Sequence, residues 1–456
     1  MSHSSRHLGL RPTLALGAAL LLATGCGSWQ REGDIRDVTP EQSLMQLFNP
    51  AGVYQGLGRL VSTSEVPFVG TVVYLPGPGT STRVLVGLSA ANRAFSFERQ
   101  GELYQANYRV EYTLTRSGQA PARAARDASI KVGSLQEALR IDESVILQQA
   151  LVVEPGAHQL TVRISDKGSS RSGVVVQSLT VPAFTAGSVT APILAYSVTG
   201  RASRSDSIDL VLNPRGAVSY GGDTLLIYIE GVQMAGPTTI PFEVRDGRDS
   251  VVLRTTVDFT GGSEVEGRIV RIKPDSAPLG RIDFLLGPDG SRGKTAGVVS
   301  FSGNWIITNF DDLISLLRYF GEGHRLDQLK NASPQARPAL WRDFFTTTDP
   351  NLQTPENEAL DAYFARLGQA NVQFSDEGIP GWRTDRGEVF VTLGPPDERF
   401  DSTPTQQGRF VRWGYFDHRL SLIFQDVTGF GRYRMTTESR SEFERVKGRV
   451  QRAAER

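Results

Sequence analysis

The stretch Gly381–Glu398, GWRTDRGEVFVTLGPPDE, places turn-forming residues on both sides of one short hydrophobic run. Gly381 follows a proline, so the chain can bend sharply just before Trp382. The tryptophan ring is large enough to favour a buried position, provided that its N–H finds an acceptor. The next residues, Thr384 to Gly387, are typical of a turn in which Asp385 bonds backbone N–H groups.

The hydrophobic run itself, Glu388–Leu393, alternates between two faces and therefore predicts a short strand. Gly394-Pro395-Pro396-Asp397 ends this strand because a proline has no N–H to donate to a neighbouring strand. The local prediction is a turn, a strand and a second turn, with Trp382 in the core beneath them.

These residues resemble the signature of the bacterial GWxTD-domain proteins, namely GWRTD followed at a fixed offset by GPPDE. The resemblance continues through Arg409–Arg434, with an aromatic strand, a hydrophobic strand ending in Asp426, and the G-x-G formed by Gly429 and Gly431. It reaches back to TPENEALDAYFARLGQAN and covers roughly Phe310 to Arg440, about one small domain. It implies a recurring domain of cell-envelope proteins whose biochemical activity is not established.

The composition favours a folded protein with several domains. The chain has 456 residues, of which 39% are hydrophobic and 21% charged. Basic and acidic residues are equal in number, 49 of each, so no net charge attracts DNA or RNA. We predict no nucleic-acid partner.

The first 25 residues resemble a bacterial lipoprotein signal peptide. Arg6, His7 and Arg11 precede the short apolar run Thr13–Ala23, which is too short to span a bilayer. The run leads into Leu22-Ala23-Thr24-Gly25-Cys26, similar to a lipobox, and Cys26 is the single cysteine of the chain. We predict a lipidated Cys26, with an ordinary secretory signal as the alternative.

Lipidation would anchor the mature protein durably, because several acyl chains each contribute about 0.8 kcal/mol per buried CH₂ group. With no spare thiol, the mature chain would have neither disulfides nor a cysteine nucleophile. Gly27 follows the cysteine where the common sorting rule would have Asp for the inner membrane, so we expect an outer-membrane lipoprotein in a host with two membranes. Residues 26–50 are interpreted as a tether, with a short helix at Pro40–Phe48.

The middle of the chain predicts two consecutive Ig-like β-sandwich domains, at residues 51–183 and 184–306, because short alternating runs recur between Gly, Pro and Ser clusters. Only Ser134–Leu151 is ambiguous between a strand pair and a short helix. The predicted strands of the first domain are Thr71–Leu75, Arg83–Leu88, Tyr104–Leu114, Gln159–Ile164 and Gly173–Val181. Those of the second are Pro192–Val198, Ser207–Leu212, Thr224–Glu230, Thr239–Arg245, Ser250–Phe259, Arg268–Ile272, Arg281–Leu286 and Ala296–Ser302.

Gly293-Lys294-Thr295 resembles the end of a phosphate-binding P-loop, but the first glycine of that motif would fall on Pro288. The residues that follow alternate like a strand and open no helix, so we set the P-loop aside. Asp289-Gly290 is interpreted as a hairpin turn.

Residues 307–456 predict an α+β domain with helices first, then an antiparallel meander and a closing helix. Apolar residues from Phe310 to Phe320 recur at helical spacing, and Ser333-Pro334 and Thr354-Pro355 are helix-start signals. Strands are predicted at Val389–Leu393, Phe410–Tyr415, Arg419–Gln425 and Arg432–Thr436. A capping box at Ser439 and Glu442 would start the last helix.

Candidate chemistry in this domain rests on Asp385, Asp397, Glu398 and Asp426, with Arg383 and Arg386 nearby in the sequence. Carboxylates at one edge of a sheet could bind a divalent cation, whereas as turn formers Asp385, Asp397 and Asp426 would be structural. Val411, Trp413 and Tyr415 alternate on one strand face, which indicates either core packing or an exposed aromatic platform for a glycan or peptide.

The sequence contains no H-E-x-x-H motif, no G-x-S-x-G elbow in a plausible context, and no cofactor or metal signature. We therefore favour a lipid-anchored envelope protein in which the sandwiches act as a spacer and the C-terminal domain binds an envelope protein or a cell-wall partner. The alternative is an envelope hydrolase that uses Asp385, Asp397 and Glu398, with or without a cation.

Overall fold

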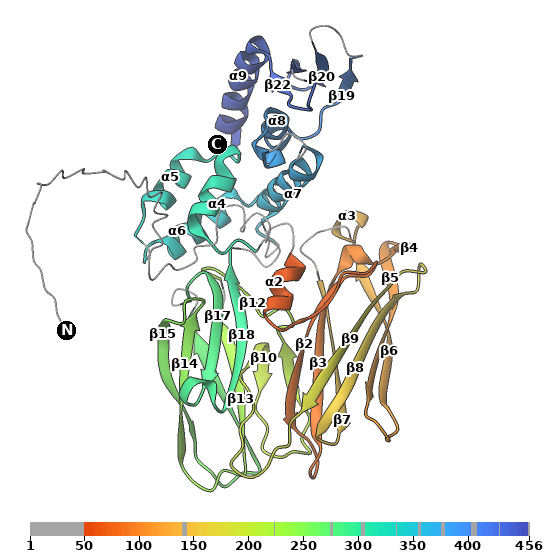
Figure 1. Cartoon of the computed structure of the whole chain (residues 1–456), viewed down its shortest axis with the longest axis vertical. Helices are drawn as coiled ribbons and strands as arrows, with labels where there is room; N and C mark the ends of the chain where they lie inside the picture. Colours follow the sequence, from red (N-terminus) through yellow and green to blue (C-terminus); the bar gives the residue numbers. More distant parts are fainter. Residues whose placement is uncertain are drawn as a thin grey trace, which may run out of the picture. The chain divides into compact units, whose positions relative to one another are not determined.

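The computed structural model describes residues 50–138, 144–222, 224–273, 277–301, 306–333, 335–353, 357–374, 379–402, 408–427 and 429–454. The predicted signal peptide, the lipidated Cys26 and the helix at Pro40–Phe48 lie outside these residues. All of these described residues belong to one compact unit. The mainly β fold class is confirmed, and the two sandwiches and the α+β part follow one another along the chain (Figure 1).

The first sandwich consists of two antiparallel sheets that share one core. One sheet has the order β1-β2-β3-β7, and in the other β5 pairs with β4, β6 and β8, and β8 pairs with β9. All five predicted strands are present, because alternation in β5, for example, buries Ala106, Tyr108 and Val110 on one face. The elements are α2 (Pro50–Gly56), β1 (Leu60–Ser62), β2 (Phe68–Pro76), β3 (Thr82–Ala91), β4 (Glu98–Gln100), β5 (Leu103–Thr115), β6 (Ala122–Val132), α3 (Leu135–Ala138), β7 (Ser144–Val153), β8 (Gly156–Asp166) and β9 (Ser172–Val181).

Several features of this sandwich differ from the sequence prediction, which also missed the short strands β1 and β4. The ambiguous segment Ser134–Leu151 contains both the short helix α3 and most of strand β7. Strand β6 was missed because its sequence, ARAARDASIKV, is polar and rich in alanine and is largely solvent-exposed. Its pairing with β5 supplies the order that its own pattern does not indicate.

The second sandwich also has two sheets, of order β11-β10-β13-β16 and β12-β18-β17-β14-β15. The predicted strands are present, and Asp289-Gly290 lies in the connection between β17 and β18, with Asp289 at φ 50°. Lys294 and Thr295 lie in strand β18, so no helix follows the P-loop-like residues. The strands are β10 (Ile193–Thr199), β11 (Asp209–Leu212), β12 (Ala217–Ser219), β13 (Leu225–Val232), β14 (Thr238–Asp246), β15 (Val251–Phe259), β16 (Val265–Ile272), β17 (Gly280–Leu286) and β18 (Gly293–Ser300).

The two sandwiches pack against each other through sheet faces. Leu75 and Leu85 of the first sandwich share a buried cluster with Ile193, Leu212 and Tyr228 of the second. Burial of apolar side chains on both faces makes the β1-β2-β3-β7 sheet an internal layer. The two sandwich domains therefore pack as adjacent layers of sheets and are not independent of each other.

A buried ion pair lies at the same junction. The guanidinium of Arg201 contacts the Glu230 carboxylate at 2.8 Å, and both side chains are at most 3% exposed. Arg201 also donates to the Pro76 carbonyl oxygen at 2.7 Å, which links it to the first sandwich. Breaking one partner of such a pair would leave an uncompensated buried charge.

The C-terminal part begins with helices, as predicted, although several helix starts differ. Asn309 caps α4 through its side chain, and Asn357 caps α7 in the same way. Ser333 lies four residues before α6, and Thr354-Pro355 lies outside the described residues. The helices are α4 (Phe310–Leu316), α5 (Gly323–Asn331), α6 (Arg337–Thr348), α7 (Glu358–Gln373) and α8 (Asp385–Leu393), with single 3-10 turns at Leu317–Tyr319 and Gly381–Arg383.

A four-stranded antiparallel meander, β19-β20-β21-β22, and the last helix complete this part. The last helix begins at Thr437, earlier than the predicted capping box, and the Thr436 hydroxyl accepts from the Ser439 N–H at 3.4 Å. Ser439 instead receives a hydrogen bond from the Ile423 N–H, which joins the helix to the sheet. The elements are β19 (Glu398–Asp401), β20 (Arg409–Tyr415), β21 (Leu420–Asp426), β22 (Arg434–Met435) and α9 (Thr437–Ala454).

Candidate functional site

The motif stretch forms a helix where the sequence predicted a strand. Residues Asp385–Leu393 are α8, and Thr384 is its N-cap. The Thr384 hydroxyl accepts a hydrogen bond from the Gly387 N–H at 2.9 Å and donates one to the Gly381 carbonyl oxygen at 2.8 Å. The strand prediction was wrong because Val389, Phe390 and Val391 are all buried, so the apparent two-face alternation has no exposed side.

Two glycines allow the motif to close on itself. A Cβ atom on Gly387 would lie 1.9 Å from the Gly381 carbonyl oxygen, and one on Gly381 would lie 2.3 Å from the Ala370 carbonyl oxygen of α7. The Gly381 N–H also donates to the Asn371 side chain at 3.0 Å. The bend is therefore held by direct contact between the backbone at Gly381 and the backbone of α7. Any residue larger than glycine at position 381 would prevent this contact.

Trp382 occupies the core position that was predicted for it. Its side chain is 1% exposed and meets the Tyr319 ring edge-on, at a centroid distance of 6.1 Å. The guanidinium groups of Arg318 and Arg383 lie 5.2 and 4.9 Å from the indole. Contrary to expectation, the indole N–H finds no acceptor within the described residues.

Asp385 is the first residue of α8, so its interpretation as a turn former is wrong. Its carboxylate accepts from the Met435 N–H at 2.7 Å and pairs with Arg440 at 2.6 Å. One turn later Glu388 pairs with Arg440 at 2.9 Å and with Lys447 at 2.7 Å. Both carboxylates lie in the first turn of α8, where their negative charge interacts favourably with the positive end of the helix dipole. These carboxylates thus join the motif helix to β22 and α9.

The second half of the motif ends the helix and starts the sheet. Gly394, at φ 86°, follows the last helical residue, and its carbonyl oxygen accepts from the Tyr415 hydroxyl at 3.0 Å. The predicted stop at Gly394-Pro395-Pro396 is confirmed, although it ends a helix. The Asp397 carboxylate accepts from the Phe416 N–H at 2.7 Å and so bonds the residue after β20, not a backbone group of its own turn. Glu398 is solvent-exposed at the start of β19.

Asp426 is the turn former that the sequence predicted. It is fully buried, and its two carboxylate oxygens accept from the N–H groups of Gly429 at 3.0 Å and Gly431 at 2.8 Å. Both glycines have positive φ angles, 75° and 85°, which other residues rarely adopt. The G-x-G segment thus fits a tight turn after β21.

Asp385 lies apart from the other two carboxylates proposed for hydrolysis. It is the first residue of the nine-residue helix α8, which at 1.5 Å per residue is about 13 Å long, and Asp397 and Glu398 follow beyond the last residue of this helix. Paired catalytic carboxylates in glycosidases lie about 5–10 Å apart. Within the described ranges, no group of three or more His, Cys, Asp or Glu side chains is arranged to hold a metal. The hydrolase alternative gains no support from this arrangement.

The inner face of the sheet is core. Val411, Trp413 and Tyr415 are at most 4% exposed, and Trp413 packs edge-on against Phe424 with a centroid distance of 4.9 Å. The interpretation of these aromatic residues as an exposed platform is wrong. They form part of the same buried cluster as Trp382 and the helices α4 to α7.

The opposite face of the same strands carries apolar side chains into solvent. Cross-strand pairing places Phe400 of β19 beside Arg412 of β20, and Arg412 beside Ile423 of β21. The Arg412 guanidinium lies 4.4 Å from the Phe400 ring centroid. At the two ends of the hairpin, Phe416 and Val427 continue the outward alternation and are 63% and 73% exposed. We call these five residues, with the partly buried Phe410, the outer face.

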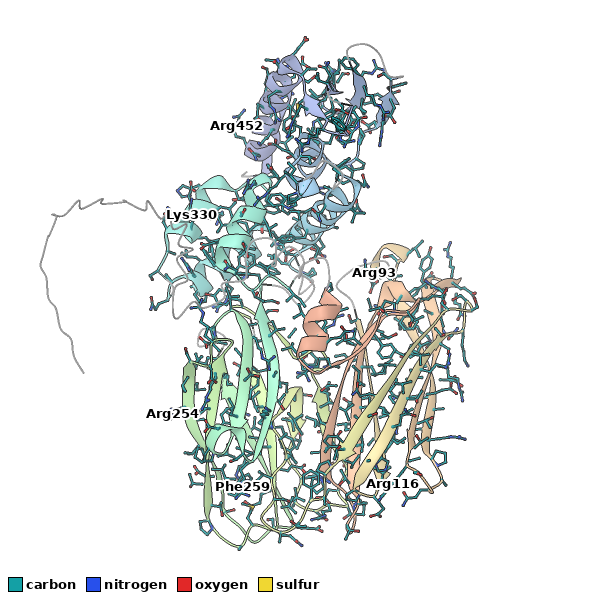
Figure 2. All side chains as sticks on the ribbon, viewed as in Figure 1. Arg93, Arg116, Arg254, Phe259, Lys330 and Arg452 are labelled. Carbon is teal, nitrogen blue, oxygen red and sulfur yellow. The ribbon has the colours of Figure 1, made fainter. Side chains whose placement is uncertain are left out.

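The sequence contains a signal for the outer face that the prediction did not use. The same alternation that buries Val411 and Trp413 places Phe410 and Arg412 on the other side. Large apolar residues on both sides of an edge-proximal strand are unusual for a sheet with one solvated face. The side chains of this part are drawn with the rest in Figure 2.

These observations define a helix-capped antiparallel sheet module that is appended to a pair of β-sandwiches. Residues 284–429 match the model of the GWxTD domain, so the chain carries a GWxTD domain. No curated protein matches the chain.

The match begins within β17 and ends at Gly429, whereas the sequence resemblance was drawn from about Phe310 to Arg440. The structure gives a reason for the earlier start. Phe301, just after β18, packs edge-on against Trp341 of α6 at a centroid distance of 4.9 Å and belongs to the core cluster of the helices.

Proposed function

We propose that this chain is a lipid-anchored cell-envelope protein whose GWxTD domain is a protein-binding module. The binding role is inferred from a contrast between the motif residues, which make contacts inside the domain, and the outer face, which is exposed to solvent. Gly381, Trp382, Thr384 and Asp385 are used internally, to bend the chain and join α7, α8 and α9. The outer face, in contrast, leaves apolar side chains in solvent around one cation.

The chemistry of the outer face favours a particular partner. Exposed aromatic and aliphatic side chains around an arginine have the composition of a protein interface core. Arg412 is solvent-exposed and stacks on Phe400, which leaves its N–H groups available to a carboxylate. The occupant we propose is an envelope protein that presents an apolar surface with an acidic residue opposite Arg412.

The lipid anchor rests on the sequence pattern ending in Cys26 and on the polar tether that follows it. Among the described residues, no helix has the length and apolar character needed to cross a bilayer. Metabolic labelling with an alkyne fatty acid would test the anchor directly. We expect the label on the wild-type chain and none on Cys26→Ser, which should also leave the membrane fraction.

The partner is tested by site-specific photo-crosslinking in cells. A photoreactive residue at position 423, on the outer face, should yield a discrete protein adduct that Arg412→Glu abolishes. The control position is 352, because Leu352 is 67% exposed in the same domain but lies between α6 and α7. Equal adducts at both positions, or adducts only with peptidoglycan, would refute a protein partner at the outer face.

A further inference from the structure

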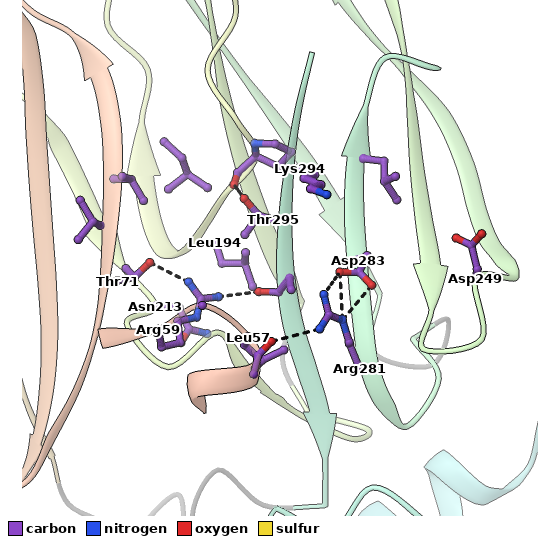
Figure 3. A pocket seen from close by; sticks show the side chains of 18 residues that line it. Leu57, Arg59, Thr71, Leu194, Asn213, Asp249, Arg281, Asp283, Lys294 and Thr295 are labelled. Carbon is purple, nitrogen blue, oxygen red and sulfur yellow. Dashed lines mark hydrogen bonds and ion pairs between the residues drawn. The ribbon is translucent and has the colours of Figure 1, made fainter. Parts of the chain in front are cut away.

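A cavity of about 560 Å³ lies between the two sandwiches. It is bordered by β2 and the segment around Arg59 on one side, and by β10, β17 and β18 on the other (Figure 3). Its volume is within the range of about 300–1,000 Å³ that is typical of small-molecule sites. The lining combines apolar side chains such as Leu57, Val73 and Leu285 with several charged groups.

Arg59 is the unusual group in this lining. Its guanidinium donates to the Thr71 hydroxyl at 2.7 Å and to the Ala296 carbonyl oxygen at 2.6 Å, and so bridges the two sandwiches (Figure 3). Both acceptors are neutral, and within the described part of the chain no carboxylate pairs with Arg59. Burial lowers the pKa of Arg59 to about 10, so the group remains a cation at neutral pH.

The backbone around Arg59 leaves room for this cation. Gly216 has a positive φ of 63°, and a Cβ atom there would lie 2.0 Å from Nη2 of Arg59. A partly buried charge without a counter-ion carries a cost in lost solvation. The described residues thus hold a cation next to a cavity without supplying a carboxylate that pairs with it.

The charged residues that line the cavity carry a net positive charge. The Arg281 guanidinium pairs with Asp283 at 2.9 Å. Asp249 pairs with Arg245 at 3.1 Å and shares this arginine with Glu243 and Asp289. Lys294 is solvent-exposed and has no ion pair among the described residues. Arg59 and Lys294 thus have no carboxylate partner among the described residues. With Arg281 they outnumber the lining acids Asp249 and Asp283 by three to two.

We propose that this cavity binds a small organic molecule through an oxyanion, a carboxylate or a phosphate, which Arg59 and Lys294 hold while the apolar lining contacts the rest of the ligand. A guanidinium suits both oxyanions because its N–H groups match their paired oxygens. The P-loop-like Gly293-Lys294-Thr295 contributes through its position on a strand of the cavity wall and not through a helix N-terminus. This site is separate from the outer face and does not depend on the lipid anchor.

The test is calorimetric titration of the purified full chain with inorganic phosphate and with succinate, at constant ionic strength. We expect saturable binding of at least one anion, and the tighter of the two identifies the preferred oxyanion. Lys294→Gln should weaken this binding about tenfold, as expected for a lost hydrogen bond to a charged group. Because Lys294 is exposed, this variant should fold normally, which circular dichroism checks.

Lys330→Gln is the matched control, since Lys330 is an exposed lysine on α5, away from the sandwiches (Figure 2). Its affinity should equal that of the wild type. Arg59→Lys keeps the charge but removes the planar fork, so it should also weaken binding if it folds. The proposal is overturned if neither anion binds saturably, or if Lys294→Gln binds as well as Lys330→Gln.

Discussion

Replacing Thr384 by valine should loosen the motif helix without changing the size of the side chain. Thr384 is fully buried, and its hydroxyl makes two hydrogen bonds, from the Gly387 N–H and to the Gly381 carbonyl oxygen. Valine would remove the N-cap of α8 and leave the buried Gly387 N–H unpaired, whereas the Gly381 carbonyl oxygen would keep the Thr384 backbone N–H at 3.2 Å. The N-cap and the bond from the Gly387 N–H are one and the same hydrogen bond, and a buried donor left unpaired costs about 1–3 kcal/mol, so we expect a loss of about 1–3 kcal/mol in the free energy of unfolding.

The matched control is Thr384→Ser, which keeps the hydroxyl and loses one methyl group, at a cost of about 1 kcal/mol. Urea denaturation followed by tryptophan fluorescence reports on this region, because Trp341, Trp382 and Trp413 all belong to the core cluster of the C-terminal part. Hydrogen exchange of Asp385–Leu393 gives a local readout. If the valine variant is as stable as the serine variant, and exchange in α8 is unchanged, the hydroxyl does not hold the motif and the reasoning fails.

Three further predictions concern other parts of the fold. Gly387→Ala would place a Cβ atom 1.9 Å from a backbone oxygen and should cost about 3 kcal/mol in stability, whereas Gly323→Ala, with open space around it, should be neutral; similar denaturation midpoints would contradict this. Glu230→Gln leaves the Arg201 charge buried at the junction of the sandwiches, so we expect a loss of about 3–5 kcal/mol in urea titrations, and a change below about 0.5 kcal/mol would argue against a role for the pair. For Asp166, burial raises the pKa, but hydrogen bonds from Ser169, Ser96 and Gly168 outweigh it, and the pKa is lowered overall. The folded state therefore binds the Asp166 proton less readily than the unfolded state, and ionised Asp166 stabilises the fold. This stabilisation is complete above the unfolded pKa of about 3.9 and is lost as the pH falls through the lowered pKa of the folded state. Asp166→Asn should flatten the acid dependence of stability, and an unchanged profile would assign that dependence to other groups.

Local sequence was sufficient for most of the sheet structure. Strands such as β5 and β8 bury every second side chain, and that period can be read from the residues alone. The Asp426 turn was also predictable, because a carboxylate followed by two glycines can bond the N–H groups of its own loop. The order of helices, meander and closing helix followed from the change of hydrophobic period from 2 to 3.6.

The motif helix could not be derived in this way. Its residues fit a strand by alternation, and helix α8 forms because Thr384 caps it, Gly387 packs on Gly381, and Asp385 and Glu388 find partners far along the chain on β22 and α9. The packing of the two sandwiches, the cation Arg59 at their cavity and the exposed outer face likewise depend on contacts between distant segments. A sequence pattern shows which side chains of a segment share a face. Which of its faces is buried against another segment depends on the tertiary structure. The face that stays exposed is the one that can bind a partner.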